Sequence, residues 1–596
     1  MSRSRVLAGV ALLLVAAVAW IGVRGLLAQR HLTHARSALA QAKTALLDRR
    51  LDDADRAITK AGHDTEAAHS LTGDLIWKAA AHIPIAGASL QAAGAVARAA
   101  DGVARKALPP AFAAARTLDP QKLRAPDGTI DVTLLKRSQP DLDKATAAAT
   151  HAAAQLDDIP SHGVVGAIRT ATDDLTKQTR ALDDALQGVR RGVRLAPAIL
   201  GSDRPRRYFV LIQQTSESRG TGGLPGGFAI LTATNGHLAI EAQGSNADLQ
   251  AGPIPPPAGV PADYVDLYGA DDAFNFWVNV NLSPDLPVVA RVIADRWQHQ
   301  SGHAVDGVVT VDSQALASIL RGSPPITVPG APALTPANLV DYLAVGQYRD
   351  FATPGGAAAG VDNSPARKQL LVKIAQVATD RLVGGGGSTL DLARGLSEAI
   401  SSGHLRMASD DPALAPGLHD AGIDGALPAG PAPVAYPVIF NSSGGKLDYF
   451  LDRSITYDGG DCSGATRRTT ITVDLTNHAP EGLPAYLTNP GAIPKIGNST
   501  INRISLMVFG TRGAKLDKAT LDGQPLDAAG GRSAAFLDIA GEAGLPRWKT
   551  LIDLPSGQKR SFVLQLTEPT AAGAPRVPEQ PLARPLHATV HLPACR

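Results

Sequence analysis

The spacing of apolar residues changes near Arg204, and this change constrains the fold more than any other feature. From about Leu26 to Leu200, Leu, Ala and Ile recur at three- and four-residue steps with charged residues between them, a pattern typical of amphipathic helices. Beyond Arg204, short apolar runs alternate with helical patterns and later stand without them. The sequence therefore predicts several folded units, as a length of 596 residues also favours.

The segment 26–200 is predicted to be all-α, a helical bundle or stalk. Four long helical stretches are separated by Pro84, by Pro109-Pro110, by the turn Ala125–Thr129 and by Pro160, since proline and glycine-rich turns interrupt helices. Small residues, mostly alanine, occupy the expected contact positions, so each helical turn buries little apolar area.

The N-terminal residues 1–25 predict a membrane anchor. The run Val6–Val23 has no charge and is just long enough to span a bilayer, and Arg3 and Arg5 before it favour a cytoplasmic N-terminus. The alternative is a cleaved signal peptide, because Ala17-Val18-Ala19 resembles a cleavage site. The apolar run continues past that site, which favours an uncleaved anchor. We therefore expect a single-pass protein of the cell membrane with most of the chain outside the cytoplasm.

Residues 201–431 are predicted to form an α/β domain. The apolar runs RYFVLI, FAILTA, HLAIEA, VDGVVTV, ITVPG and HLRMAS read as strands, and Asn235-Gly236 is a strong hairpin signal. Helical patterns alternate with them. One is capped by Asp312, one by Thr335 with Pro336 at its first position, and one runs from Ala366 to Val383.

Residues 432–596 are predicted to form an all-β, sandwich-like domain, because seven short alternating runs follow one another without helices. Both cysteines of the chain, Cys462 and Cys595, lie here. In an exported domain we expect them to pair, and closing the loop would contribute on the order of 4–5 kcal/mol. The alternative is two unrelated buried thiols.

The composition excludes several classes of protein. The net charge of +2 is too balanced for a nucleic-acid partner, and 44% hydrophobic with 19% charged residues suits a globular chain. With no CxxC or Cys/His cluster, a zinc or iron–sulfur site is not expected.

A glycine-rich stretch after the strand RYFVLI is the most distinctive motif. It fails the dinucleotide fingerprint at Pro225 and the P-loop at Phe228, where lysine is needed, and it leads into a strand rather than a helix. One interpretation is a hairpin turn. The other is a loop whose backbone N–H groups face an anion, with Arg219 beside it. The glycines are Gly220, Gly222, Gly223, Gly226 and Gly227.

A Ser-x-x-Lys pattern at Ser443–Lys446 is set aside. The Ser-Asp-Asn and Lys-Thr-Gly motifs of penicillin-binding enzymes are absent, and the pattern precedes a strand rather than opening a helix.

The stretch RRYFVLIQQTSESRGTGGLPGGFAILTATNGHL resembles a family of bacterial envelope proteins known as domain of unknown function 4012. Further blocks that resemble it are FWVNVNLSPDLPVVA, VDGVVTVDSQALASILRG, LTPANLVDYL and NSSGGKLDYFLDRSITY. The resemblance extends over nearly the whole chain and implies a surface location without an established activity.

More weakly, the α/β segment resembles LytR–CpsA–Psr enzymes, which transfer glycopolymers from polyprenyl pyrophosphate carriers to the cell wall. The matching blocks are Glu217-Ser218-Arg219, VDGVVTVDSQALASILRGSPPITVPG, YRDF and SPARKQLLVKI. The resemblance implies phosphate contacts from Arg219, Arg349, Arg367 and Lys368. It also implies a divalent cation such as Mg²⁺ on Glu217 and on Asp248 or Asp271.

Two departures from that enzyme pattern affect the functional prediction. The enzymes carry a second aspartate in the loop after their first strand, and this chain has glycines there. They also carry Pro-Arg-Asp after their third strand, and this chain reads GSNADL there, without the arginine. The first hypothesis is therefore an envelope-biogenesis protein that binds a lipid-linked or phosphorylated glycopolymer, or a cell-wall polymer, without turning it over. The alternatives are a glycopolymer transferase and a non-catalytic scaffold for envelope proteins, in which the arginines form surface ion pairs.

Overall fold

The computed structural model describes residues 3–48, 50–83, 87–159, 163–249, 252–351, 365–383, 388–460, 462–488, 500–526, 537–593 and 595, without the side chains of 3–15, 46–47, 365–366, 368 and 485. The chain divides into two compact units. The first comprises Met1–Leu123 and Asp131–Pro197, and the second comprises Arg124–Ile130 and Ala198–Arg596. The predicted boundary between residues 431 and 432 falls inside the second unit.

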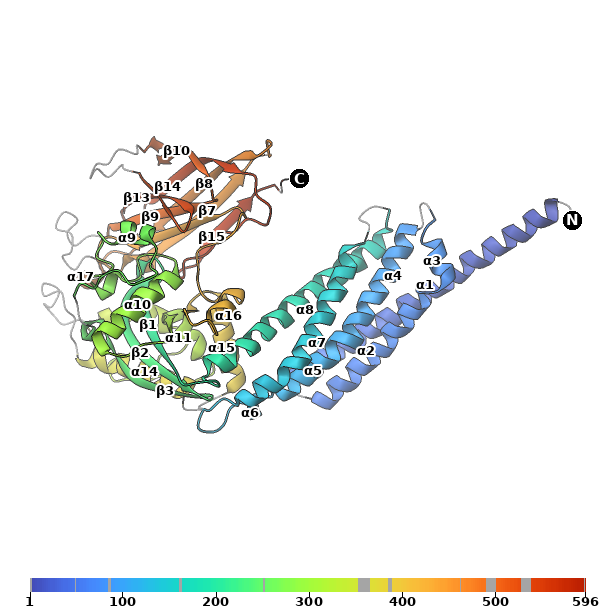
Figure 1. The fold of residues 1–596 in the computed structure, drawn as a ribbon, viewed down its shortest axis with the longest axis horizontal. Coiled ribbons are helices and arrows are strands. Elements are labelled where there is room, and N and C mark those ends of the chain that lie inside the picture. Colours follow the sequence, from blue (N-terminus) through green and yellow to red (C-terminus); the bar gives the residue numbers. More distant parts are fainter. Residues whose placement is uncertain are drawn as a thin grey trace. The chain divides into compact units, whose positions relative to one another are not determined.

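The first unit is an all-α bundle, as predicted, and Figure 1 shows its long helices running side by side. Alanine supplies much of its core: Ala54, Ala61, Ala68, Ala92 and Ala97 are fully buried. Such small side chains allow close approach of helix backbones. The helices are α1 (Arg3–Leu47), α2 (Leu51–Leu71), α3 (Leu75–Ala80), α4 (Gly87–Asp101), the π-helical η1 (Gly102–Ala107), α5 (Leu108–Thr117), α6 (Pro120–Leu123), α7 (Val132–Asp157) and α8 (Gly166–Ile199).

The predicted break at Pro109-Pro110 is wrong, because α4, η1 and α5 follow one another as one helical run. The two prolines lie at the start of α5, directly after the π-turn, where the regular i→i−4 bonding of the helix is already interrupted. The preceding π-turn is closed by the N–H of Leu108, which donates to the carbonyl of Val103. The predicted interruptions at Pro84 and Pro160 lie outside the described residues.

The predicted membrane anchor is also wrong. In the part of the chain that the structure describes, no helix combines the length and the apolar character needed to cross a bilayer. The apolar run Val6–Val23 instead belongs to α1, which continues into the bundle. The end of the run is held by polar contacts: the Trp20 indole donates to Asp74 over 3.1 Å, and Arg24 forms an ion pair with Asp74 at 3.2 Å. The predictions of a single-pass topology and a cell-membrane location are corrected with it.

The second unit begins with a five-stranded mixed sheet of order β3-β2-β1-β4-β5. Strand β1 pairs in parallel with β4, and the other neighbours are antiparallel. Asn235 (φ 48°) and Gly236 (φ 89°) form the predicted hairpin turn, in the left-handed conformations that such a turn requires. The strands are β1 (Arg206–Arg219), β2 (Gly222–Thr234), β3 (His237–Ser245), β4 (Gly307–Val311) and β5 (Leu405–Ala408).

Helices surround this sheet, and most of them follow the predicted segments. Asp312 caps α11 as predicted, its carboxylate accepting from the N–H groups of Gln314 and Ala315. The helices are α9 (Ala262–Tyr268), α10 (Leu286–Ser301), α11 (Ser313–Ile319), α12 (Leu339–Asp341), the π-helical η4 (Tyr342–Gly346), α13 (Gln347–Asp350), α14 (Pro365–Leu382), α15 (Thr389–Ser401) and α16 (Ala415–Asp420), with short 3-10 turns η2 (Asn246–Asp248) and η3 (Trp277–Asn279).

Two local predictions in this region are wrong. The segment ITVPG forms only one isolated bridge, between Ile326 and Leu334, rather than a strand. The next helix begins at Leu339 with Asn338 as its N-cap, not at Thr335. The reason is that the Asn338 side chain accepts a bond from the backbone N–H of Thr335 at 2.7 Å, and this local bond stabilises a turn before the helix starts.

The C-terminal part is the predicted β-sandwich, with sheets of order β11-β10-β14-β8-β7-β15 and β12-β13-β9-β6 (Figure 1). Apolar residues from both sheets, including Trp548, form one buried core between them. The elements are β6 (Ala435–Asn441), η6 (Leu447–Phe450), β7 (Leu451–Gly459), β8 (Thr466–Asn477), α17 (Ala485–Thr488), β9 (Asn502–Gly510), β10 (Lys515–Leu521), β11 (Gln524–Pro525), β12 (Asp538–Glu542), β13 (Leu545–Leu554), β14 (Lys559–Pro569) and β15 (Leu586–His591).

The predicted disulfide is confirmed. Cys462 and Cys595 are bonded, with their Cα atoms 5.7 Å apart. The bond closes a loop of 133 residues and ties the segment after β15 to the loop between β7 and β8.

Candidate functional site

The glycine-rich stretch is a β-hairpin. Strand β1 continues to Arg219, which pairs with Gly222, and Ser218 pairs with Gly223. A side chain at Gly220 would place its Cβ atom 2.2 Å from the carbonyl oxygen of Leu282, and one at Gly223 would lie 2.3 Å from the backbone of Gln214. These glycines are therefore needed because other backbone segments approach closely, which is the hairpin interpretation.

Glu217 forms an ion pair with Lys446, at the end of the segment between β6 and η6. Both side chains are about nine-tenths buried, and the Lys446 ammonium also lies over the rings of Tyr348 and Tyr486, 5.8 and 5.0 Å from their centroids. Burial lowers the pKa of Lys446 to about 8, whereas the adjacent carboxylate favours its charged form. The Glu217 carboxylate is therefore compensated within the fold.

Ser218 is bound to Asp448 by two hydrogen bonds, from its backbone N–H (2.8 Å) and from its hydroxyl (2.7 Å). The same carboxylate accepts from the amide groups of Asn441 (3.1 Å) and Asn502 (2.7 Å). Asp448 is only 2% exposed, and these donors compensate for its burial.

Arg219 directs its guanidinium to backbone carbonyls rather than to an open cleft. It donates to Asn441 (3.2 Å), Ser218 (2.9 Å) and Val278 (3.3 Å), and burial lowers its pKa to about 10. We call the set Glu217, Ser218, Arg219, Asn441, Lys446 and Asp448 the polar junction. It fastens the end of β1 to the segment that connects β6 with β7.

The other predicted phosphate-binding cations make different contacts from Arg219. Arg349 is exposed on α13. Arg367, on α14, lies over the ring of Tyr348 at 5.6 Å, with Gln347 at 3.5 Å. The side chain of Lys368 lies outside the described residues. Arg367 thus shares the Tyr348 ring with Lys446, whereas Arg219 bonds to a different set of backbone atoms.

The predicted Mg²⁺ ligands do not form a site. Glu217 is paired with Lys446, and Asp248 caps a short turn by accepting from the backbone and hydroxyl of Ser245, both at 2.8 Å. Asp271 lies in the loop after α9. Within the described ranges, no three His, Cys, Asp or Glu side chains are grouped to hold a metal ion. The residues therefore do not fit a Mg²⁺ centre.

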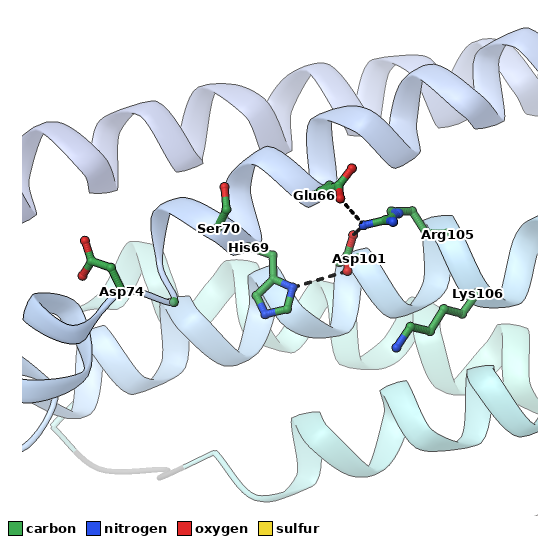
Figure 2. A pocket seen from close by; sticks show the side chains of 8 residues that line it. Glu66, His69, Ser70, Asp74, Asp101, Arg105 and Lys106 are labelled. Carbon is green, nitrogen blue, oxygen red and sulfur yellow. Dashed lines mark hydrogen bonds and ion pairs between the residues drawn. The ribbon is translucent and has the colours of Figure 1, made fainter.

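A polar groove of about 560 Å³ lies in the first unit, where the sequence did not predict a site. Figure 2 shows the residues that line it, which come from the end of α2, the turn between α2 and α3, the end of α4 and η1. The groove is lined by Glu66, His69, Ser70, Gly73, Asp74, Asp101, Arg105 and Lys106.

Most of the charges in the groove are paired. Arg105 contacts Glu66 at 2.7 Å and Asp101 at 3.6 Å, and His69 lies 3.3 Å from the second oxygen of Asp101 (Figure 2). The Asp101 side chain is 10% exposed, and its Oδ1 atom has no hydrogen-bond donor. Lys106 is exposed beside these groups. The groove thus combines a buried hydrogen-bond acceptor, Asp101, with an exposed cation, Lys106.

The sequence carries only a faint signal of this groove. Asp101 and Arg105 are four residues apart, a spacing that is equally typical of a solvated helix face. The π-turn that widens the backbone at η1 cannot be recognised from apolar spacing.

Comparison with known families supports one resemblance. Residues 203–348 match the model of a family described as a protein of unknown function, DUF4012. The predicted resemblance is thereby confirmed over this segment, which contains strands β1 to β4 of the five-stranded sheet and the glycine-rich hairpin. No curated protein and no solved structure matches the chain. The resemblance to LytR–CpsA–Psr enzymes stays a prediction.

Proposed function

We propose that this chain is a non-catalytic scaffold protein of cell-envelope biogenesis. The observation that carries the proposal is the polar junction. The motif that suggested an active site, Glu217-Ser218-Arg219, makes its contacts to other parts of the fold. Glu217 is paired with Lys446, and Arg219 is bonded to carbonyl groups. Breaking such buried pairs costs several kcal/mol, which gives these residues a structural reason to be charged.

The transferase hypothesis needs a cleft beside Arg219 and at least two carboxylates within reach of a metal. The predicted carboxylates lie in separate environments, and Glu217 is already compensated by Lys446. The disulfide between Cys462 and Cys595 supports a role in an oxidising compartment, which is compatible with the envelope.

A second candidate is binding of a phosphorylated or lipid-linked glycopolymer near α13 and α14. The specific observation is that Arg349 is exposed next to Tyr348, on whose ring Arg367 lies. Guanidinium groups bind phosphate oxygens bidentately. A double R349A/R367A variant that binds a polyprenyl pyrophosphate as well as the native chain does would contradict this candidate.

The scaffold proposal is tested by two measurements on the full chain. Incubation with a polyprenyl-pyrophosphate-linked glycan, a cell-wall glycan as acceptor and Mg²⁺ is expected to release no polyprenyl phosphate above the buffer control. Cross-linking in the producing cell is expected to give the same defined protein adducts for the native chain and for an R219K variant, because the motif does not contact partners. Turnover that disappears in an E217Q variant of native stability would overturn the proposal.

A further inference from the structure

Strand β3 is an edge of the five-stranded sheet that the rest of the described chain leaves uncovered. It pairs with β2 on one side only, and none of its nine residues is buried. The backbone bond from Ile130 to Gly236 (3.0 Å) and the contact of Thr129 with His237 (3.3 Å) lie at the turn end of the strand. From Leu238 to Ile240, the described residues hold no backbone–backbone hydrogen bond beyond the pairing with β2. The outer edge of β3 is therefore open to another strand.

The turn geometry shows which groups this edge presents. Thr234 and His237 face each other across a two-residue turn, and they form the closing hydrogen-bonded pair of such a hairpin. In an antiparallel ladder, hydrogen-bonded pairs alternate with pairs whose N–H and C=O groups point away from the partner strand. The N–H and C=O groups of Leu238 and Ile240 therefore point outward.

Apolar side chains continue from this edge across one face of the sheet. Ile240 pairs with Leu231 of β2, and Leu231 pairs with Tyr208 of β1. Since every second residue of a strand points to the same side, Leu238 and Ile212 lie on this face as well. Leu231, Leu238 and Ile240 are half-buried, and Ile212 is 42% exposed. One more strand beside β3 would extend this apolar face.

The first part of β3 lacks the features that keep exposed edges apart. Between the turn and Glu241 it carries neither proline nor lysine, which commonly protect edge strands. A one-residue register shift against β2 leaves Glu241 as a bulge, so the regular stretch ends there. The exposed edge strand β15, by contrast, lies between Pro585 and Pro593.

We propose that two copies of this chain associate through β3, as an antiparallel pair centred on Ala239. Leu238 of each copy then exchanges two backbone hydrogen bonds with Ile240 of the other, so the outward groups of both strands are satisfied. A two-fold axis makes the contact self-complementary and closes it at two copies, because each copy has one such edge. The inference goes beyond the scaffold function and does not rest on it.

Only one register avoids both ends of the regular stretch. A pair centred on Leu238 would need the carbonyl group of Gly236, which already accepts from the N–H of Ile130. A pair centred on Ile240 would have to span the bulge that follows this residue. The pair centred on Ala239 avoids both obstacles.

The side chains favour a second copy over a strand of another sequence. In this register His237 of one copy lies opposite Glu241 of the other, so no like charges meet across the contact. Leu238 and Ile240 lie opposite each other on the same side, which joins the two apolar faces into one. A peptide without this pattern would gain the backbone hydrogen bonds alone.

Sedimentation equilibrium of the full-length chain measures the association. The native chain is expected to dimerise reversibly below about 100 μM. Leu238→Pro removes an outward N–H and leaves the pairing with β2 intact, and Ile240→Lys places a charge on the shared apolar face. Each change is expected to weaken dimerisation at least about tenfold. The matched control is Val590→Lys, at an exposed position of the edge strand β15, which should dimerise as the native chain does.

A single introduced cysteine tests the register. The two native cysteines are bonded to each other, so Ala239→Cys adds the one free thiol. In an antiparallel pair centred there, the two Cα atoms lie about 4.5 Å apart, within the range that a disulfide spans. Mild oxidation should link Ala239→Cys into a covalent dimer at least about tenfold faster than Ala242→Cys, an exposed position of the same strand away from the two-fold axis. If Leu238→Pro disturbs β3, this result decides the outcome.

Three results would overturn the proposal. The first is a native chain that stays monomeric at about 100 μM. The second is a dimer that Leu238→Pro and Ile240→Lys leave unchanged, or that Val590→Lys weakens equally, which would assign the contact to another surface. The third is equal rates of oxidation for the two cysteine variants. The scaffold function is tested by cross-linking to other proteins and survives each of these results.

Discussion

The polar junction and the groove are two charged clusters with opposite relations to solvent. In the junction, Asp448 is 2% exposed and accepts from four donors, and Glu217 has a buried cationic partner. In the groove, Asp101 has an oxygen without a donor, and Lys106 is exposed. The comparison teaches that a dense charged motif locates a site only if its groups are not already satisfied by the fold.

The largest expected effect concerns the disulfide of the second unit, because the first unit has no such covalent bond. Replacing both Cys462 and Cys595 by Ser is expected to lower the free energy of unfolding of the second unit by about 4–5 kcal/mol, because the open loop is freer in the unfolded chain. Urea unfolding followed by the fluorescence of tryptophan measures it. Reduction of the native chain with a thiol should give the same loss, and an unchanged unfolding midpoint would show that the bond is not a major constraint.

Breaking the junction should cost nearly as much. Lys446→Met leaves Glu217 buried without its cation, and the expected loss is about 3–5 kcal/mol in denaturant unfolding. The matched control is Lys559→Met, whose more exposed pair with Asp474 should contribute less than about 1 kcal/mol. If the two variants are equally stable, the junction does not hold the fold together.

A second buried polar cluster, around Glu542, predicts that the stability of the second unit depends on pH. Glu542 is 3% exposed and accepts from Tyr268 at 2.7 Å, and burial raises its pKa to about 7. The native state therefore keeps a proton that the unfolded chain releases above about pH 4.5, so stability falls as pH rises from about 4.5 through 7, by roughly 3 kcal/mol.

A Glu542→Gln variant isolates this term, because it cannot release the proton. Its unfolding free energy should decline less than that of the native chain between pH 5 and 8. Part of the decline that remains comes from Asp285, because burial raises the pKa of this carboxyl group to about 6. An exposed acid, Glu398, serves as the control, and Glu398→Gln should keep the native slope. Identical slopes for Glu542→Gln and the native chain would refute the assignment.

The smallest stability effect is expected in the groove. Glu66 is about half exposed and pairs with the exposed Arg105, so Glu66→Ala should change the unfolding free energy of the first unit by less than about 1 kcal/mol. Thermal unfolding followed by circular dichroism measures the change. A loss as large as that of Lys446→Met would remove the contrast between the two clusters.

The sequence predicted the elements whose signals are local. The hairpin at Asn235-Gly236 and the cap at Asp312 follow from backbone geometry and short-range bonds. The alternating runs gave most strands of the sandwich, and the two cysteines gave the disulfide. The change of apolar spacing near Arg204 lies close to the division of the chain at Pro197.

The contacts of the predicted site residues join parts of the chain that are far apart in the sequence. Local sequence signals do not predict such contacts. Glu217 meets Lys446 only because β1 and the segment after β6 are brought together by the fold. Lys446 belongs to the set-aside Ser-x-x-Lys pattern and to the block NSSGGKLDYFLDRSITY, and neither pattern indicates that it meets Glu217. The membrane anchor was wrong because an apolar run does not reveal that its end, at Trp20, packs against Asp74.

Hydrogen exchange of the native chain and of Lys446→Met tests the central claim most directly. Backbone amides exchange faster where local structure loses stability. The account predicts faster exchange in residues 215–219 and 441–448, which contain the polar junction, and native exchange in residues 66–74 and 101–106 of the groove. Native exchange in the junction of Lys446→Met would contradict it.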